Sequence, residues 1–180
     1  MSKTSAVAAK ALTSNHFELF GLAPAFALDL ARLDAAYRDI QAQVHPDRFT
    51  QAGDAERRAS MQMATRVNEA YRTLKSPVLR AKYLLELHGV DVDFETNTAM
   101  PPEFLMEQMD LRERLEEARD VKALDALQAR LSEDKKGLER KIKEQLEGQK
   151  FVEAKGLVRK LQFLERFGED IDAAHEALES

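Results

Sequence analysis

The residues of this chain whose types and spacing could do chemistry are His45 and Asp47, separated by Pro46. An imidazole and a carboxylate at this spacing could act as a general acid–base pair or could ligate a metal ion. A catalytic pair needs a pocket that shifts pKa values and excludes water, and the surrounding sequence predicts a solvated loop instead. No spacing typical of a metal site, such as His-x3-His, occurs among the other histidines, His16, His88 and His175. We therefore predict no catalytic residue, no metal site and no cofactor.

The same tripeptide has two other interpretations. Pro46 lacks an N–H and biases His45 away from the helical region, so the stretch could be only a turn that ends a helix. Loops also carry many of the contacts that proteins make with partners, so the stretch could instead be a loop that contacts another protein. Spacing alone leaves both interpretations open.

Two predicted amphipathic helices flank the tripeptide and must position it. Upstream, apolar residues follow a helical spacing at Leu30, Leu33, Tyr37, Ile40 and Val44. Downstream, the same spacing recurs at Met63, Val67, Ala70 and Leu74. Two such stripes joined by a short polar loop would bury each other as an antiparallel hairpin. The tripeptide would then lie at the exposed tip of that hairpin.

Composition narrows the classes of function. The chain has 180 residues, a formal net charge of −5 and no cysteine. The charge argues against nonspecific binding to nucleic acid, which needs a basic surface. The lack of cysteine excludes disulfides and thiolate metal sites and fits a reducing compartment. No apolar run approaches the roughly 20 residues of a membrane span. Residues 1–14 lack the apolar core of a secretory signal, and we expect a flexible tail there.

Capping residues mark where the helices of the first half begin. Asn15 and Glu18 form a predicted capping box for a short helix that stops at Gly21. Asp29 and Asp54 are the predicted N-caps of the two hairpin helices, which end near residues 44 and 75. A fourth helix is predicted over residues 78–88, after the cap-and-proline pair at 76–77. Its predicted apolar residues are Leu79, Tyr83, Leu84 and Leu87.

The second half is predicted to be a bundle of three helices. A polar linker at residues 91–100 precedes helices over 101–119 and 120–148, and a last helix from 149 to at least 167. Whether the last helix continues past Gly168 is left open, and its predicted core face is Leu157, Leu161 and Leu164. Nothing has the alternation of a strand. The predicted fold is therefore all-α, with a helical hairpin domain over 15–90 and a three-helix bundle over 101–180.

The helix predicted from residue 101 is apolar on two sides. At about 100° per residue, one arc holds the predicted core face, which is Phe104, Gln108, Leu111, Leu115 and Ala118. The other side holds Leu105, Met106 and Met109 among charged residues, namely Asp110, Arg112, Glu113, Glu116 and Glu117. This second side could be buried as well, or it could be an exposed Leu/Met surface with a charged rim, as adaptable binding surfaces often are.

Phe163 raises the same question on the last predicted helix. It falls about 120° from Leu157, off the predicted core arc, and has Arg159 and Arg166 nearby. An aromatic side chain flanked by arginine could anchor an interface, whereas a singly exposed phenylalanine is also ordinary.

The first half of the chain resembles a J-domain, the module by which J-proteins stimulate the ATPase of DnaK-type chaperones. Three features carry the resemblance. A short helix ends in Phe-Gly-Leu at 20–22, His-Pro-Asp lies between two apolar stripes, and the following helix contains Asn-Glu-Ala-Tyr-Arg-Thr-Leu at 68–74. The tripeptide alone is a weak motif, but its combination with the other two is specific.

The rest of the chain narrows this to a resemblance to the HscB family, the J-type co-chaperones of iron–sulfur cluster assembly. The matching stretches are 76–89, 104–109 and 159–164, and the resemblance covers about residues 15–167. It implies that the J-domain docks on the DnaK-type chaperone HscA and stimulates its ATPase, and that the C-terminal bundle binds the cluster scaffold IscU. The alternative is a J-protein that serves a general DnaK-type chaperone with other clients.

The resemblance also implies site residues. The chaperone-binding residues would be His45, Pro46, Asp47, Arg48 and Arg38. The scaffold-binding residues would be Leu105, Met106, Met109, Asp110, Arg112, Glu113, Glu117 and Phe163, which the helical wheel had already placed off the core face.

The chain departs from the family at several positions. Met109 and Asp110 stand where Leu and Glu are common, and His16 replaces a usual Tyr. The second helix, which is usually basic in J-domains, is only mildly so here. The cysteine-rich zinc motif of eukaryotic relatives is missing, which favours a bacterial, cytoplasmic protein.

Overall fold

The structure, a computed structural model, describes residues 14–94 and 100–179, and every regular element in these ranges is helical. The elements are α2 (His16–Leu19), α3 (Leu30–Val44), the 3-10 helix η1 (Pro46–Phe49), α4 (Asp54–Lys75), α5 (Pro77–Leu87), α6 (Pro102–Glu117), α7 (Val121–Glu147) and α8 (Phe151–Glu179). The all-α prediction is confirmed.

The chain forms two compact units, divided between Leu84 and Leu85 near the end of α5. The predicted linker at 91–100 follows this division, and its residues 95–99 lie outside the described ranges, as do residues 1–13 of the predicted tail. Ser14, the last residue of that tail, is buried. The predicted domain ranges, 15–90 and 101–180, therefore remain a prediction.

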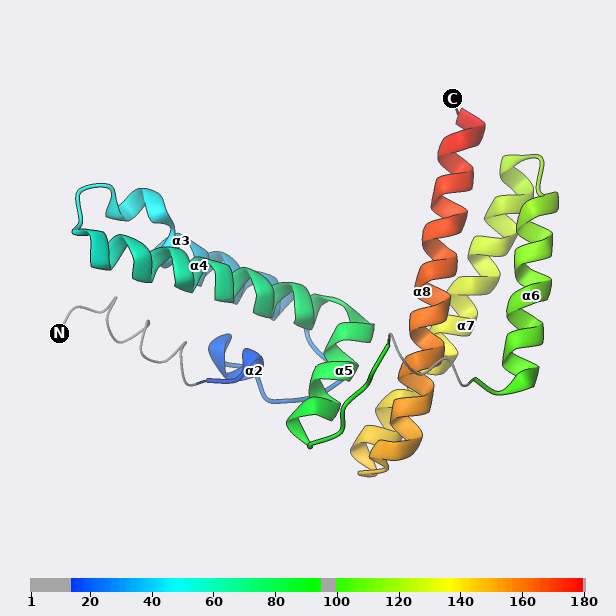
Figure 1. Ribbon diagram of the computed structural model, residues 1–180, viewed down its shortest axis with the longest axis horizontal. Coiled ribbons are helices and arrows are strands. Elements are labelled where there is room, and N and C mark those ends of the chain that lie inside the picture. Colours follow the sequence, from blue (N-terminus) through cyan, green and yellow to red (C-terminus); the bar gives the residue numbers. More distant parts are fainter. Residues whose placement is uncertain (1–13, 95–99, 180) are drawn as a thin grey trace. The chain divides into compact units, whose positions relative to one another are not determined.

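The first unit is built on an antiparallel hairpin of α3 and α4, with η1 in the connection at its far end (Figure 1). The predicted stripes supply the core, because Leu33, Val67 and Leu74 are fully buried, whereas Leu30 is 40% exposed. The predicted cap of α3 is also confirmed, since the side chain of Asp29 accepts a hydrogen bond from the backbone N–H of Arg32.

The short helix α2 begins and ends as its sequence predicts. The side chain of Asn15 accepts a hydrogen bond from the N–H of Glu18 at 2.9 Å, and the Glu18 carboxylate accepts one from the N–H of Asn15 at 3.1 Å. This reciprocal pair is the predicted capping box. Gly21 follows with a φ of +66°, a conformation that glycine adopts without steric cost and that ends the helix.

Two details of α4 and α5 differ from prediction. Asp54 is the first residue of α4 rather than its cap, and the cap is Gly53, which offers no side chain. Asp54 instead forms an ion pair with Arg57. On α5, Leu79 and Leu87 are each 41% exposed. The buried residues of this helix are Val78, Arg80, Ala81, Leu84 and Leu85. The apolar residues of α5 surround most of the helix, so spacing could not select the buried face.

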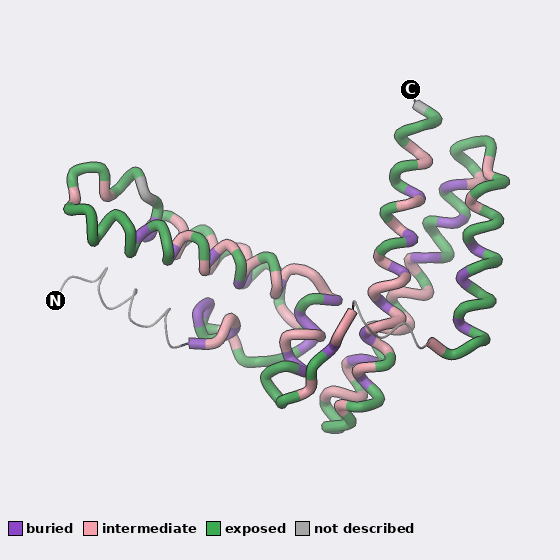
Figure 2. Tube along the Cα trace, in the orientation of Figure 1, coloured by how far each residue is buried: buried purple, intermediate pink, exposed green. Residues whose placement is uncertain are grey.

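The second unit is a three-helix bundle in which α6 and α8 run in the same direction and α7 runs against them (Figure 1). The buried residues lie along the sides where the helices meet (Figure 2). The bundle core is Phe104, Leu111, Leu127, Leu131, Leu164, Phe167 and Ile171. Leu157, predicted as core, is only half-buried, and its neighbour Val158 is fully buried in its place.

The last helix does not stop at Gly168 but continues to Glu179. A Cβ atom at position 168 would lie 3.2 Å from a terminal methyl carbon of Leu131 on α7. The glycine therefore permits a close approach of two helices, and it is not a C-cap.

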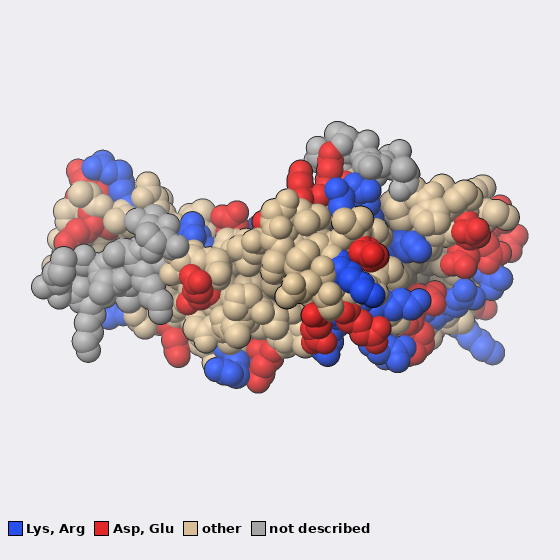
Figure 3. Space-filling model, turned by 90° about the horizontal axis from the view of Figure 1, so that it is seen from below, with Lys and Arg blue, Asp and Glu red and all other residues tan. Residues whose placement is uncertain are grey.

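Charges of both signs are interspersed on the face of the molecule shown in Figure 3. Within the described residues, no helix combines the length and the apolar composition that crossing a bilayer requires.

Candidate functional site

The His-Pro-Asp tripeptide lies at the turn between α3 and η1. Helix α3 ends at Val44, and His45 adopts an extended ψ of 129°, as expected for a residue that precedes proline. Pro46 opens η1, where its missing N–H has no helical acceptor to lose. The sequence therefore ends one helix and starts a short turn at the same point, as predicted.

The backbone of this turn is fixed by hydrogen bonds on both sides of the tripeptide. The hydroxyl of Ser60 on α4 donates to the carbonyl of Val44 at 2.7 Å, and this bond is buried. The guanidinium of Arg48 donates to the carbonyl of Ala42 at 3.0 Å. The backbone N–H of Asp47 donates to Nδ1 of His45 at 3.3 Å. Since Nδ1 accepts, the neutral imidazole carries its proton on Nε2.

Ser60 was not among the predicted site residues, although the sequence contains a signal for it. It stands three residues before Met63, at the start of the apolar stripe of α4, and it is 5% exposed. A hydroxyl on a buried stripe needs a hydrogen-bond partner. Here that partner is the last carbonyl of α3.

The tip is exposed rather than enclosed. The side chain of His45 is 51% exposed and that of Asp47 is 86% exposed, with Nδ1 and the carboxylate 3.5 Å apart. An acid–base pair this open to water lacks a pocket that excludes solvent from a reaction. The geometry therefore fits a contact with another protein better than catalysis. No group of three potential metal ligands occurs within the described residues.

A polar network behind the tip joins the two hairpin helices. The hydroxyl of Tyr37 donates to Asn68 at 2.8 Å, and its ring stacks on Tyr71 with centroids 4.0 Å apart. The hydroxyl of Tyr71 donates to Asp34 at 2.9 Å, and Lys75 donates to both oxygens of that carboxylate at 2.7 and 2.9 Å. Asn68 and Tyr71 of the J-domain-like run thus position the hairpin, and do not themselves form the tip.

Hydrogen bonds and nearby charges in this network keep Asp34 and Lys75 ionised. The hydrogen bonds from Lys75 and Tyr71 hold the pKa of Asp34 below its usual range, and the nearby charge of Arg38 lowers that pKa further. The same carboxylate raises the pKa of Lys75. Arg38 itself is exposed on α3, so it is available to a partner.

The second candidate surface is on α6, where the two predicted faces separate clearly. Phe104 and Gln108 are buried, whereas Leu105 is 38%, Met106 70% and Met109 62% exposed. Among the described residues of this helix, apolar side chains therefore lie in solvent on the side that the wheel placed opposite the core. We call Leu105, Met106 and Met109 the α6 patch.

Charged residues surround the α6 patch, and some are already paired. Asp110 forms an ion pair with Arg114 at 3.0 Å, and Arg112 forms one with Asp170 of α8, also at 3.0 Å. Glu113 and Glu117 are exposed. Exposed ion pairs contribute little to stability, so these side chains can exchange partners at low cost.

Phe163 differs from the exposed anchor that one interpretation of the sequence predicted. It is half-buried and packs against the bundle core. Its ring meets Phe104 edge to face, with centroids 6.0 Å apart. Burying part of the ring against the core leaves only its remainder for a partner. On the helical wheel Phe163 lies about 120° from Leu157 and about 140° from Val158, so spacing alone does not predict its contact with the core.

The chain is similar to known proteins over nearly its whole length. Residues 100–172 match the family model described as the HSCB C-terminal oligomerisation domain. A co-chaperone HscB homologue from Burkholderia multivorans is 52% identical over 172 residues, covering 94% of this chain and 98% of the homologue.

Two solved structures share the fold. The human co-chaperone HscB is 32% identical with a TM-score of 0.85, over 89% of this chain and 82% of the human one. The chaperone HscB from Vibrio cholerae is 36% identical with a TM-score of 0.83, over 92% of this chain and 99% of that one. With its hairpin tip and its three-helix bundle, this chain therefore belongs to the HscB family of J-type co-chaperones, which act with DnaK-type chaperones in iron–sulfur cluster assembly.

Proposed function

We propose that this chain stimulates the ATPase of the DnaK-type chaperone HscA through the hairpin tip and brings it the cluster scaffold IscU through the α6 patch. The observation that carries the proposal is that each of the two units presents one exposed, non-catalytic surface. The chemistry then belongs to the chaperone, and this chain couples the arrival of its client to ATP hydrolysis. The lack of cysteine and the bacterial relatives support a site of action in the bacterial cytoplasm.

The rigidity of the hairpin tip supports the chaperone contact. The tip backbone is held by Ser60 and Arg48, so little conformational entropy would be lost when the tip docks. The exposed Nε2–H of His45 and the carboxylate of Asp47 offer a donor and an acceptor to the partner. Arg48 and the exposed Arg38 would add positive charge to the contact. Pro46, between His45 and Asp47, would be part of the same contact.

The α6 patch supports the scaffold contact. Methionine side chains adapt to irregular partner surfaces, and an apolar centre with a charged rim is the usual anatomy of an interface. Glu113 and Glu117 would form the acidic part of this rim, and Asp110 and Arg112 would join it by exchanging partners. The exposed part of Phe163 would complete the scaffold-binding surface from α8.

The substitution His45→Gln tests the chaperone contact. It keeps the size and polarity of the side chain but removes the imidazole, so we expect it to abolish stimulation of HscA in a single-turnover ATPase assay. Thermal stability and scaffold affinity should remain at wild-type values, because the side chain is half-exposed and lies outside the bundle. Stimulation at the wild-type rate by this variant would refute the proposal.

The same assay separates the proposed partner from the alternative. If this chain stimulates a general DnaK-type chaperone as well as it stimulates HscA, and if the protein captures unfolded chains rather than a cluster scaffold, the general J-protein is the correct function. Selective stimulation of HscA together with capture of IscU supports our proposal.

A further inference from the structure

The C-terminal unit contains a hollow that the proposed function does not use. It lies where α7 and α8 meet the start of α6 and has a volume of about 440 Å³. Apolar groups of Met100, Pro101 and Leu157 form part of its lining. Three cationic side chains line it as well, namely Lys141 of α7 and Arg159 and Lys160 of α8.

The charge of this hollow is unusual for the chain. Its three cations face one carboxylate, Glu153, whereas the whole chain has a net charge of −5. Elsewhere on the same helices lysines are paired, as Lys135 is with Glu165 at 2.8 Å. Within the described part of the chain, none of the three cations of the hollow forms an ion pair, although Lys160 also lies over the ring of Phe104 at 5.4 Å. The hollow is thus a local cationic site on an acidic protein.

Two polar atoms of residues that line the hollow are buried and lack a hydrogen-bond partner. They are Nε of Arg159 and Oε1 of Gln145. A buried donor or acceptor without a partner costs roughly 1–3 kcal/mol. Because these two atoms are buried, a ligand in the hollow would contact the outer atoms of the same side chains instead.

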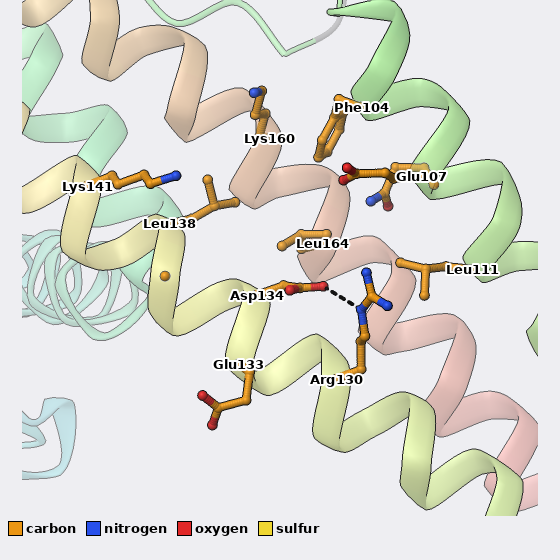
Figure 4. A pocket seen from close by; sticks show the side chains of 12 residues that line it. Phe104, Glu107, Leu111, Arg130, Glu133, Asp134, Leu138, Lys141, Lys160 and Leu164 are labelled. Atoms are coloured by element: carbon orange, nitrogen blue, oxygen red, sulfur yellow. Dashed lines mark hydrogen bonds and ion pairs between the residues drawn. The ribbon is translucent and has the colours of Figure 1, made fainter.

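A neighbouring groove extends the hollow. It has a volume of about 290 Å³, lies between α6, α7 and α8, and shares Lys141 and Lys160 with the hollow. Figure 4 shows Lys141 on α7 extending toward Leu138, and Lys160 on α8 on the side of Phe104. The cation of Arg130 in this groove is already matched by Asp134 at 3.4 Å. Glu107 and Glu133 line the groove as well, so its cations and carboxylates balance, and the excess of positive charge is confined to the hollow.

We propose that the hollow binds an extended acidic peptide segment of a partner protein, in which carboxylates alternate with apolar side chains. The carboxylates would pair with Lys141, Arg159 and Lys160, and the apolar side chains would cover Met100, Pro101 and Leu157. A free anion would leave this apolar lining unused. A nucleic acid would need a wider basic field than three cations on a chain of negative net charge provide.

The test measures peptide binding to the full-length protein by fluorescence anisotropy. The probe is a fluorescein-labelled peptide that alternates glutamate and leucine over six residues, and its counterpart has every glutamate replaced by glutamine. We expect the acidic probe to bind and the glutamine probe to bind at least about tenfold more weakly, since charge-assisted hydrogen bonds are the stronger kind. Inorganic phosphate should not displace the acidic probe at equal concentration.

Matched variants locate the binding site. The double variant K141Q/K160Q should weaken binding of the acidic probe at least about tenfold, and R159Q should weaken it separately. The control K122Q/K143Q removes the same charge from α7 outside the hollow and should leave binding unchanged. Thermal melting of each variant confirms that it is folded, and the exposed control and the double variant should melt like the wild type.

Three outcomes would overturn the inference. These are no binding of the acidic probe at millimolar concentration, an equal loss of binding in K122Q/K143Q and K141Q/K160Q, or displacement by phosphate alone. Because the probe is a synthetic peptide and neither HscA nor IscU is present, this result is independent of the proposed function.

Discussion

The hairpin tip combines a backbone fixed by hydrogen bonds with side chains that are exposed to solvent. Its backbone is anchored to α3 and α4 through Arg48 and Ser60, while the side chains of His45 and Asp47 remain open to solvent. An anchored backbone with free side chains is suited to recognition, because the contact geometry exists before the partner arrives. The anchoring residue Ser60 is therefore expected to matter to the tip although it makes no contact with solvent.

Replacing Ser60 by alanine tests this anchor. The substitution removes the hydroxyl that donates to Val44 and leaves a buried carbonyl without that partner, so we expect a loss of about 1–3 kcal/mol in the free energy of unfolding. Urea denaturation measures this loss, and faster hydrogen exchange of the Asp47 and Arg48 amides should accompany it.

Thr65→Ala provides the matched control for Ser60→Ala on the same helix. Its hydroxyl donates to the carbonyl of Met61 at an exposed position, and its removal should change stability by no more than about 0.5 kcal/mol. Equal losses in the two variants would show that Ser60 does not anchor the tip.

His16 makes the stability of the first unit depend on pH. Its ring stacks on Tyr83 with centroids 4.2 Å apart, and its Nδ1 is buried without a partner. Burial lowers the pKa of His16 below its ordinary value of 6.5, the charge of Arg66 lowers that pKa further, and Glu69 opposes the shift. The unfolded chain therefore binds the proton more readily than the folded chain does.

The sign of the effect follows from this difference in proton binding. As pH falls through the ordinary histidine pKa, the unfolded state gains protons first, so the free energy of unfolding decreases from about pH 7 toward about pH 5. His16→Phe keeps an aromatic ring for the stack but does not titrate, and we expect its stability to change less over this range. Chemical denaturation at several pH values measures the slopes, with His175→Phe as the control. Identical slopes for the wild type and His16→Phe would exclude His16 as the cause.

At the scale of single helices, α6 and α8 show where a helical wheel succeeds and where it fails. On α6 the apolar residues fall into two separate arcs, so the wheel separated Phe104 from Met109 but left open whether the second arc is buried, and the structure shows Met109 exposed. On α8 the apolar residues 157, 158, 161 and 164 form one broad arc, and spacing alone does not say which edge faces α7. The close approach at Gly168, the burial of Val158 and the packing of Phe163 beside Phe104 are tertiary contacts that spacing does not predict.

Because the α6 patch is exposed and Phe163 is half-buried, substitutions at the two places should have different effects on scaffold affinity and on stability. The triple variant L105A/M106A/M109A should lose about 3 kcal/mol or more of scaffold affinity if the patch is the centre of the interface, with little change in thermal stability. Phe163→Ala should instead reduce the free energy of unfolding by about 1–3 kcal/mol, because its ring is half-buried against the core.

Isothermal titration with the scaffold and thermal denaturation measure these two quantities. Val152→Ala shortens a side chain of a residue that is 78% exposed, and it serves as the control for both measurements. If the triple variant melts early while retaining its scaffold affinity per folded molecule, the patch is core and not interface.

For the whole molecule, the sequence predicts the helices far better than it predicts what they bury. Apart from the end of α8, which the sequence left open, helix ends agree within one or two residues because local signals set them, as Asn15, Asp29 and Gly89 illustrate with their caps and positive φ. Burial depends on contacts between distant elements, so the exposure of Leu79 could not be obtained from spacing. The spacing of Ser60 on the apolar stripe signals a buried hydroxyl but does not identify its partner on α3. The scaffold-binding and chaperone-binding roles that we propose rest on family membership and exposure together.

We propose that the hairpin tip and the α6 patch act together, so that the arrival of the client is coupled to ATP hydrolysis. The most direct test is the single-turnover ATPase rate of HscA with this protein, as IscU is titrated at concentrations that alone leave the chaperone largely unoccupied. We predict that IscU raises the rate with the wild type, whereas L105A/M106A/M109A gives the same rate as the wild type without scaffold but no further rise when IscU is added. An equal scaffold-dependent rise with both proteins would contradict the account.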